Sequence, residues 1–393
     1  MSRRPLRIPT LLAPVLAAFA LSTPAAAAWL ESGAPAPTPV STPWWNPPPP
    51  PTPFPTTRWL PPPPPPPPHH PYDTGDAGAR ALRDALSGAS LGQAYGHGGL
   101  TIVPVLASGR IPAHPAMRTL DDALRSGTLR IAELGSASVP SILVDNRGWQ
   151  PVFLMAGEII VGGKQDRVIR EDAVIPARSG PTEVAVYCVE QGRWTPVAGR
   201  FESAPYAADA DLRSRAASGA GQEAVWSHVA RKSADAGVRS ETQSYDDYAR
   251  SPAVAREVDE YVRRCPRPSV WRGRVIGAVF LSGDDVLGVD LFPDASLMSA
   301  MWPKLVRSYA SQAIQRGWSG RHDSGGASSV LESLRAAWPS YEGRVGSATR
   351  HGLGVPGFSS WGLTVDGRVV HIAALPDSSA GWVEPPPPWY PYE

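Results

Sequence analysis

The chain has little cysteine and none of the standard metal or redox motifs. Only 2 of its 393 residues are cysteines, and neither Cys188 nor Cys265 belongs to a CxxC pair or has histidines at zinc-site spacing. HExxH and EF-hand patterns are also missing, so we expect no metal and no cofactor. In an oxidising compartment, Cys188 and Cys265 can form a disulfide. Two separate buried thiols are the alternative.

An excess of charge of either sign is also lacking. The chain carries 37 lysines and arginines against 36 aspartates and glutamates, a formal net charge of +1. Nucleic-acid-binding domains usually carry a basic patch or stripe, and the basic residues here are spread along the chain. We therefore expect no nucleic-acid partner. Only Lys164, Lys232 and Lys304 are lysines, and we attribute this arginine bias to genomic composition.

Long hydrophobic runs are missing except at the N-terminus. There, "MSRRPLR" is basic, "IPTLLAPVLAAFAL" is apolar and "STPAAAAW" is rich in small residues. This order predicts a signal peptide over residues 1–28, cleaved after Ala28 and too short for a membrane anchor. No later run approaches the length of a membrane span, so we expect no transmembrane segment after cleavage. The sequence thus predicts a secreted, periplasmic or cell-envelope protein.

Proline is abundant, with 46 residues, and it gathers at both ends of the chain. Residues 29–76 form a predicted disordered stalk that includes the unbroken octaproline Pro61–Pro68, and residues 377–393 form a similar tail. An octaproline adopts polyproline II and spans about 25 Å. We interpret the stalk as an inert spacer. The alternative is a ligand for an aromatic groove on an unknown protein or cell-envelope partner.

The predicted globular domain covers residues 77–376 and has an α+β pattern. Its first half contains short Val- and Ile-rich segments separated by turn residues, which predict an antiparallel β-rich half. An Ala-, Arg- and Glu-rich region of helices follows over residues 209–264. The smaller α+β C-terminal section has a hairpin around Ser282–Asp285, a long helix over Ser296–Arg316, a second helix and two final strands.

Two local signals in the first half are specific enough to test. Thr119 followed by two acidic residues, with Gly127 beyond them, predicts a short capped helix. Leu100–Ser108 is a predicted strand, and Pro104 within it predicts a sheet edge or a bulge, because proline cannot donate to a ladder.

The stretch "GEIIVGGKQDR", from Gly157 to Arg167, has the most charged and polar chemistry in the chain. It does not fit a phosphate-binding P-loop, which needs Gly-Lys followed by Ser or Thr and then a helix. Here Gln165 replaces the hydroxyl residue, and the following "RVIREDAVI" predicts a strand. We therefore interpret the stretch as a strand followed by a polar turn.

A larger pattern of motifs resembles one family. These motifs include "TLDDALRSG", "VDNRGWQPVFLMAGEIIVGGKQDRVI", "IPARSG", "VYCVEQGRW", "GAVFLSGDDVLGVDLF" and "WPKLVRSYASQAI". Together they resemble the ARG and rhodanese-phosphatase-superfamily-associated protein domain, a bacterial family of unknown biochemical function. The resemblance covers about Gly99–Leu375. Its most specific parts are Gly157-Glu158, Lys164–Arg167 and Cys188–Glu190 with Gly192–Trp194. It implies a fold and no reaction.

The polar residues of these motifs support two hypotheses. Two strand ends and a turn could bring them to one rim of a sheet, either as an ion-paired cluster that orders the sheet or as a ligand or catalytic site. The candidates are Glu158, Lys164, Gln165, Asp166, Arg167, Glu190 and Arg193. We favour the structural hypothesis, which describes an exported, non-enzymatic binding or structural module. The alternative is a hydrolase or binding protein for a phosphorylated or ADP-ribosyl-type small molecule.

Overall fold

The computed structural model describes residues 76–109, 111, 116–134, 140–193, 200–317 and 324–377. The predicted signal peptide, the octaproline and the proline-rich tail from residue 378 lie outside the described residues. So does Trp194, one of the residues that carry the family resemblance.

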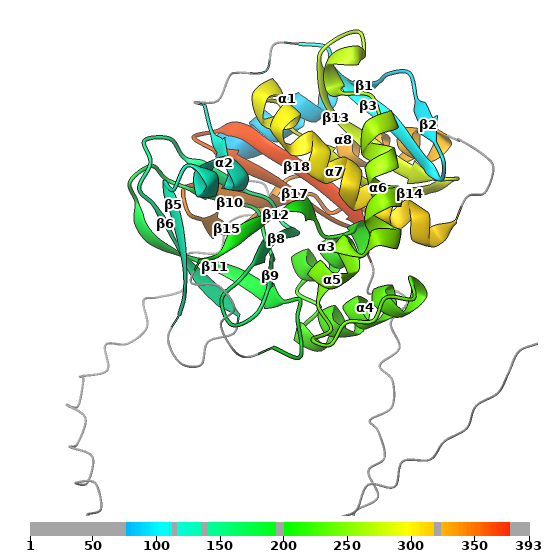
Figure 1. Ribbon diagram of the computed structural model, residues 1–393. Coiled ribbons are helices and arrows are strands. Elements are labelled where there is room, and N and C mark those ends of the chain that lie inside the picture. Colours follow the sequence, from blue (N-terminus) through cyan, green and yellow to red (C-terminus); the bar gives the residue numbers. More distant parts are fainter. Residues whose placement is uncertain are drawn as a thin grey trace, which may run out of the picture. The chain divides into compact units, whose positions relative to one another are not determined.

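The described residues form an α+β fold, which confirms the predicted fold class, and their strands make three sheets (Figure 1). The largest sheet has nine strands and joins the first part of the domain to its last part, in the order β1-β3-β13-β14-β18-β17-β16-β15, with β2 also paired to β3. Its strands are β1 (Ala89–Leu91), β2 (Tyr95–His97), β3 (Leu100–Ala107), β13 (Val275–Ser282), β14 (Asp285–Leu291), β15 (Ser340–Val345), β16 (Ala348–Gly352), β17 (Phe358–Val365) and β18 (Arg368–Pro376).

The two smaller sheets belong to the middle of the chain. One has six strands in the order β12-β8-β9-β11-β6-β5, and the other has three in the order β10-β7-β4. Their strands are β4 (Arg118–Thr119), β5 (Leu129–Glu133), β6 (Ser141–Asn146), β7 (Val152–Leu154), β8 (Glu158–Val161), β9 (Arg167–Ile169), β10 (Ala173–Ile175), β11 (Gly180–Cys188) and β12 (Glu202–Ala207).

Helices cover these sheets and connect them. The described helices are α1 (Ala77–Ser87), α2 (Leu120–Arg125), α3 (Ala210–Ser218), α4 (Gln222–Asp235), α5 (Tyr245–Arg250), α6 (Pro252–Arg264), the 3-10 turn η1 (Pro268–Val270), α7 (Ala295–Arg316) and α8 (Gly325–Ala336). None of them is long and apolar enough to cross a membrane.

Apolar side chains alternate between the two faces of the large sheet, so each face packs against its own hydrophobic cluster. In β13, Phe280 packs in a cluster with residues of α7, whereas its neighbours Val279 and Leu281 pack in a second cluster with residues of α1 and α8. Successive strand side chains point to opposite faces, so α7 covers one face of the sheet and α1 with α8 covers the other. Figure 1 shows α7 lying over the strands of this sheet.

The six-stranded sheet is divided in the same way. In β8, Ile159 packs with residues of α3 to α6, and the next residue, Ile160, packs with residues of α2 and of the three-stranded sheet. Because apolar side chains occupy both faces, this sheet is buried between two layers. Any polar group placed within it must find a partner inside the protein.

Most of the local signals read from the sequence are confirmed. The side chain of Thr119 accepts a hydrogen bond from the backbone N–H of Asp122 at 3.2 Å and caps α2. The hairpin turns between β13 and β14, where Ser282 pairs with Asp285. The predicted helix over Ser296–Arg316 begins one residue earlier, at Ala295.

Pro104 does not lie in an edge strand, which was one of the two alternatives that the sequence predicted. Its strand β3 is an interior strand, with β13 on one side and β1 and β2 on the other. On that second side, β2 pairs with residues 100–102 and β1 with residues 105–107, so the proline lies in the gap between them. On the other side, β13 is irregular between Val275 and Gly277, next to the partner of Pro104. The bulge alternative therefore describes this strand.

Candidate functional site

The "GEIIVGGKQDR" stretch folds as a hairpin that consists of β8, a glycine turn and β9. The two strands pair antiparallel, so no helix follows the turn and the P-loop arrangement is excluded. Gly162 and Gly163 have φ angles of 117° and 57°, a region that favours glycine. A Cβ at Gly163 would also lie 2.4 Å from the ring of Phe201. The second glycine is therefore required both by its backbone angle and by its neighbour.

The turn places Asp166 beside Glu190 and Arg193, two residues that follow the end of β11. The Arg193 guanidinium bonds both carboxylate oxygens of Glu190 at 2.8 Å through Nε, and Oδ1 of Asp166 at 3.0 Å through Nη2. Its Nη1 donates to the carbonyl of Gly163 at 2.7 Å. Glu190 in turn accepts from the backbone N–H of Asp166 at 3.2 Å. The arginine thus joins the hairpin turn to the neighbouring strand end.

Gln165 and Arg167 complete this group, which we call the motif cluster (Gln165, Asp166, Arg167, Glu190 and Arg193). Gln165 Nε2 donates to the carbonyl of Glu190 at 2.7 Å, and Arg167 Nη1 donates to Oε1 of Gln165 at 3.4 Å. Arg167 also lies 3.6 Å from the carboxylate of Glu133. The five predicted residues are therefore brought together, and they bind one another.

Lys164 and Glu158, which the sequence predicted at the same rim, are not part of the motif cluster. Lys164 is exposed, and its backbone N–H, rather than its ammonium group, donates to Glu133 at 2.9 Å. Glu158 is fully buried and lies 2.6 Å from the ammonium group of Lys304 on α7. The reason is position along the strand, because Glu158 begins β8 whereas the glycine turn follows the opposite end of β8, after Val161.

Lys304 forms a second ionic cluster that the motif analysis missed. Its Nζ donates to Glu158 and Asp121 at 2.6 Å each and to Ser203 Oγ at 2.9 Å, and its side chain is only 3% exposed. One signal was available in the sequence. Lys304 lies between Trp302 and Leu305 on the apolar face of the long helix, where a charged group needs a partner.

Two further ionic networks are buried in the protein. Their residues were not among the site residues predicted from the sequence. In the larger, Arg213 binds both oxygens of Asp290 at 2.7 and 2.9 Å. His371 lies between Asp290 at 3.0 Å and Asp172 at 2.5 Å. The four side chains are fully buried. In the smaller network, the carboxylate of Asp209 pairs with a histidine and a lysine of α4.

In the larger network, the charged side chains neutralise one another. Burial alone would lower the pKa of His371, but the two aspartates outweigh burial and raise this pKa to about 9. Burial likewise opposes ionisation of Asp290, and Arg213 reverses the effect and lowers the pKa of Asp290. Two cations therefore face two carboxylates at neutral pH. Such a network orders the interior and leaves no group available for a ligand.

The motif cluster differs from this network in one respect, because burial has the largest effect on the pKa of the Asp166 carboxyl. Burial raises its pKa to about 6, and the hydrogen bond from Gly162 and the charge of Arg193 offset only part of this effect. A carboxyl group that titrates near neutrality is one property expected of an acid–base residue.

The two cysteines are free buried thiols, so the structure contains no disulfide between them. Cys188 ends β11, where its backbone N–H bonds the side chain of Gln222, and Cys265 ends α6 and packs in the core around α7. Burial raises the pKa of Cys188 to about 11 and that of Cys265 to about 12. Of the two alternatives, separate buried thiols describe the structure. Neither is a reactive thiolate.

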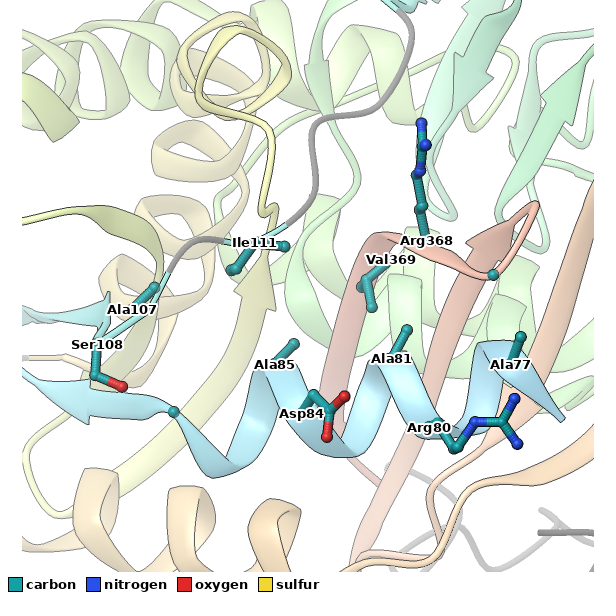
Figure 2. A pocket seen from close by; sticks show the side chains of 13 residues that line it. Ala77, Arg80, Ala81, Asp84, Ala85, Ala107, Ser108, Ile111, Arg368 and Val369 are labelled. Atoms are coloured by element: carbon teal, nitrogen blue, oxygen red, sulfur yellow. The ribbon is translucent and has the colours of Figure 1, made fainter. Parts of the chain in front are cut away.

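No three or more His, Cys, Asp or Glu residues within the described ranges are grouped so that they could hold a metal ion. Among the cavities in the described part of the chain, two have volumes well within the range of small-molecule sites. One is a groove of about 450 Å³ beside α1. Figure 2 shows Ala77, Ala81 and Ala85 of this helix on the side that faces Val369 and Ile111. The other, of about 640 Å³, is polar and contains no residue of the motif cluster.

The fold and the motif cluster together define an α+β domain in which a charged hairpin turn is tied to a neighbouring strand. The family model described as "ARG and Rhodanese-Phosphatase-superfamily-associated Protein domain" matches residues 88–375, and the chain belongs to this family. No curated protein and no solved structure matches the chain.

Proposed function

We propose that the protein is an exported, non-catalytic binding module in which the motif cluster orders the fold. One observation carries this proposal. The charged and polar side chains of the cluster bond to one another. The guanidinium of Arg193 by itself contacts Glu190, Asp166 and the carbonyl of Gly163. A catalytic or anion-binding arginine would instead keep its N–H groups available for the substrate.

Replacing Arg193 with glutamine tests the structural role of the cluster. We expect the free energy of unfolding to fall by about 3 kcal/mol, because two carboxylates would lose their buried cation. The side chain of Arg193 is 12% exposed and those of its partners 5–8%. Urea denaturation at pH 7 measures this loss. Lys164→Gln removes a positive charge from the same turn at an exposed position and should leave the stability almost unchanged.

The second candidate function is the binding or hydrolysis of a phosphorylated or ADP-ribosyl-type small molecule at the motif cluster. The raised pKa of Asp166 favours it, since such a carboxyl could transfer a proton near pH 6. Under this alternative, Arg193→Gln would keep the stability of the wild type, and inorganic phosphate would protect the wild type but not the variant. That pair of results would refute the structural role.

Export is the other part of the proposal, and it rests on the order of basic, apolar and small residues in positions 1–28. The mature protein should begin near Trp29 and be recovered outside the cytoplasmic membrane. N-terminal sequencing of the protein from its native host checks both points. A cytoplasmic product that retains Met1 or Ser2 would contradict export.

A further inference from the structure

The polar cavity of about 640 Å³ lies where several segments distant in sequence meet. The loop between β9 and β10, the end of α3 and the strands β15, β16 and β17 all contribute to its wall. We call it the two-arginine cavity. Its lining residues are Arg170, Glu171, Ala216, Ala217, Ser218, Ser340, Glu342, Arg350, Gly352, Gly354, Phe358, Ser359 and Ser360.

Within the described part of the chain, the first arginine of this cavity, Arg170, has no carboxylate partner. The guanidinium of Arg170 lies over the ring of Tyr187, 4.6 Å from its centroid. Among the described residues it forms no ion pair, and its Nε is buried without a hydrogen-bond acceptor. The glutamate next to it in the chain, Glu171, also lines the cavity.

The second arginine is only partly satisfied. Arg350 Nε donates to Glu342 at 2.8 Å, and the guanidinium lies over the ring of Trp361 at 4.7 Å. Its Nη1 is buried and lacks an acceptor. The side chain is 12% exposed, whereas that of Glu342 is 43% exposed. Glu342 therefore binds one side of the guanidinium, and Nη1 on the other side has no acceptor among the described residues.

Unmatched buried donors and acceptors are few among the described residues, and this cavity contains two of them. Eight buried side-chain atoms in the described part of the chain lack a hydrogen-bond partner, and two of them belong to the arginines of this one cavity. A buried donor without an acceptor destabilises the folded state, and these two nitrogens have almost no accessible surface, so a ligand would have to bind the remaining nitrogens of the same two guanidinium groups. The fully buried Arg213, by comparison, bonds a carboxylate, a carbonyl and a hydroxyl.

We propose that the two-arginine cavity binds a small molecule through its phosphate or carboxylate group, with Arg170 and Arg350 as the anion-binding residues. A guanidinium is always charged, and its planar fork matches both kinds of oxyanion. The volume is within the range of small-molecule sites. This inference names the ligand class and rests on the proposed binding function, but it places the site away from the motif cluster.

The acidic residues of the cavity narrow the class of ligand further. Glu171 and Glu342 balance the two arginines, so the lining carries no net formal charge and is not built for a ligand with several negative charges. Serine hydroxyls supply additional donors and acceptors at positions 218, 340, 359 and 360. The ligand therefore carries one oxyanion together with hydroxyl or amino groups that can bond the carboxylates and the serines.

The test measures thermal stabilisation of the full-length mature protein by inorganic phosphate and by acetate. Each is compared with chloride at equal ionic strength. We expect one of the two anions to stabilise the wild type and Arg239→Gln, which removes an exposed arginine outside the cavity. Arg170→Gln should weaken the apparent affinity by about tenfold. Arg350→Gln should do the same, and Arg170, which makes no ion pair with a described residue, keeps the test valid if the Arg350 variant does not fold.

The identity of the stabilising anion distinguishes a phosphate ligand from a carboxylate ligand. The proposal is overturned if neither anion exceeds chloride, or if Arg170→Gln binds as tightly as the wild type. In either case, a destabilised Arg193→Gln would leave the proposed function standing. Protection that is lost in Arg193→Gln but kept in Arg170→Gln would instead place the anion at the motif cluster, and both proposals would then be wrong.

Discussion

Replacing Arg213 with methionine is expected to lower the free energy of unfolding by about 3–5 kcal/mol, the range for breaking a buried ion pair from one side. The substitution removes both bonds to Asp290, and this carboxylate is fully buried. Chemical denaturation at pH 7 measures the loss. At this pH His371 is still protonated, because the two aspartates hold its pKa at about 9.

The same substitution at a surface ion pair provides the control. Arg125 lies 3.0 Å from Asp122, but its side chain is 73% exposed, and exposed pairs contribute little to stability. Arg125→Met should therefore leave the free energy of unfolding almost unchanged. Equal effects of the two substitutions would contradict the view that the Arg213 network orders the interior.

Replacing Lys304 with methionine is expected to cost about 3–5 kcal/mol as well, because Glu158 would be left buried without its cation. Methionine retains most of the aliphatic length of lysine, so the loss reports on the charge more than on packing. The matched control is Lys164→Met in the hairpin turn, where the lysine is exposed. A surface substitution of this kind usually changes stability by less than about 0.5 kcal/mol.

The pH dependence of the Lys304 variant gives a second measurement. An unpaired buried carboxyl prefers its neutral form, and burial already raises the pKa of Glu158 above its ordinary value. In the variant, the folded state would bind more protons than the unfolded state between neutral pH and the ordinary glutamate range. The destabilisation should therefore shrink as pH falls through that window. A cost that is constant from pH 7 to pH 5 would show that the loss comes from packing.

Local elements were predictable because short segments of the chain determine them. Thr119 begins α2 through a bond three residues away, and the hairpin turn after Ser282 depends on neighbouring residues only. The short Val- and Ile-rich segments identified strands of the middle sheets, since a strand that is buried on both faces needs apolar side chains throughout. The sequence motifs also indicated the family, which the match over residues 88–375 confirms.

The partners of the charged residues were only partly predictable. Asp166, Glu190 and Arg193 were expected together because they follow strand ends that pair in one sheet, and the structure joins them. Glu158 was assigned to the same group, but its partner Lys304 lies 146 positions away. No periodicity or spacing connects two residues so distant, and only the packing of α7 brings them into contact.

The sequence by itself determined the charge pattern, the hairpin turn, the helix caps and the α+β class, because these depend on neighbours within a few positions. Tertiary structure alone decided that Cys188 and Cys265 stay apart and that Arg213 meets Asp290. It also decided that Arg170 and Arg350 share one cavity. The physical reason is that a buried charge or donor must be satisfied in three dimensions. Its partner is therefore chosen by how layers pack, and distance along the chain carries no information about that choice.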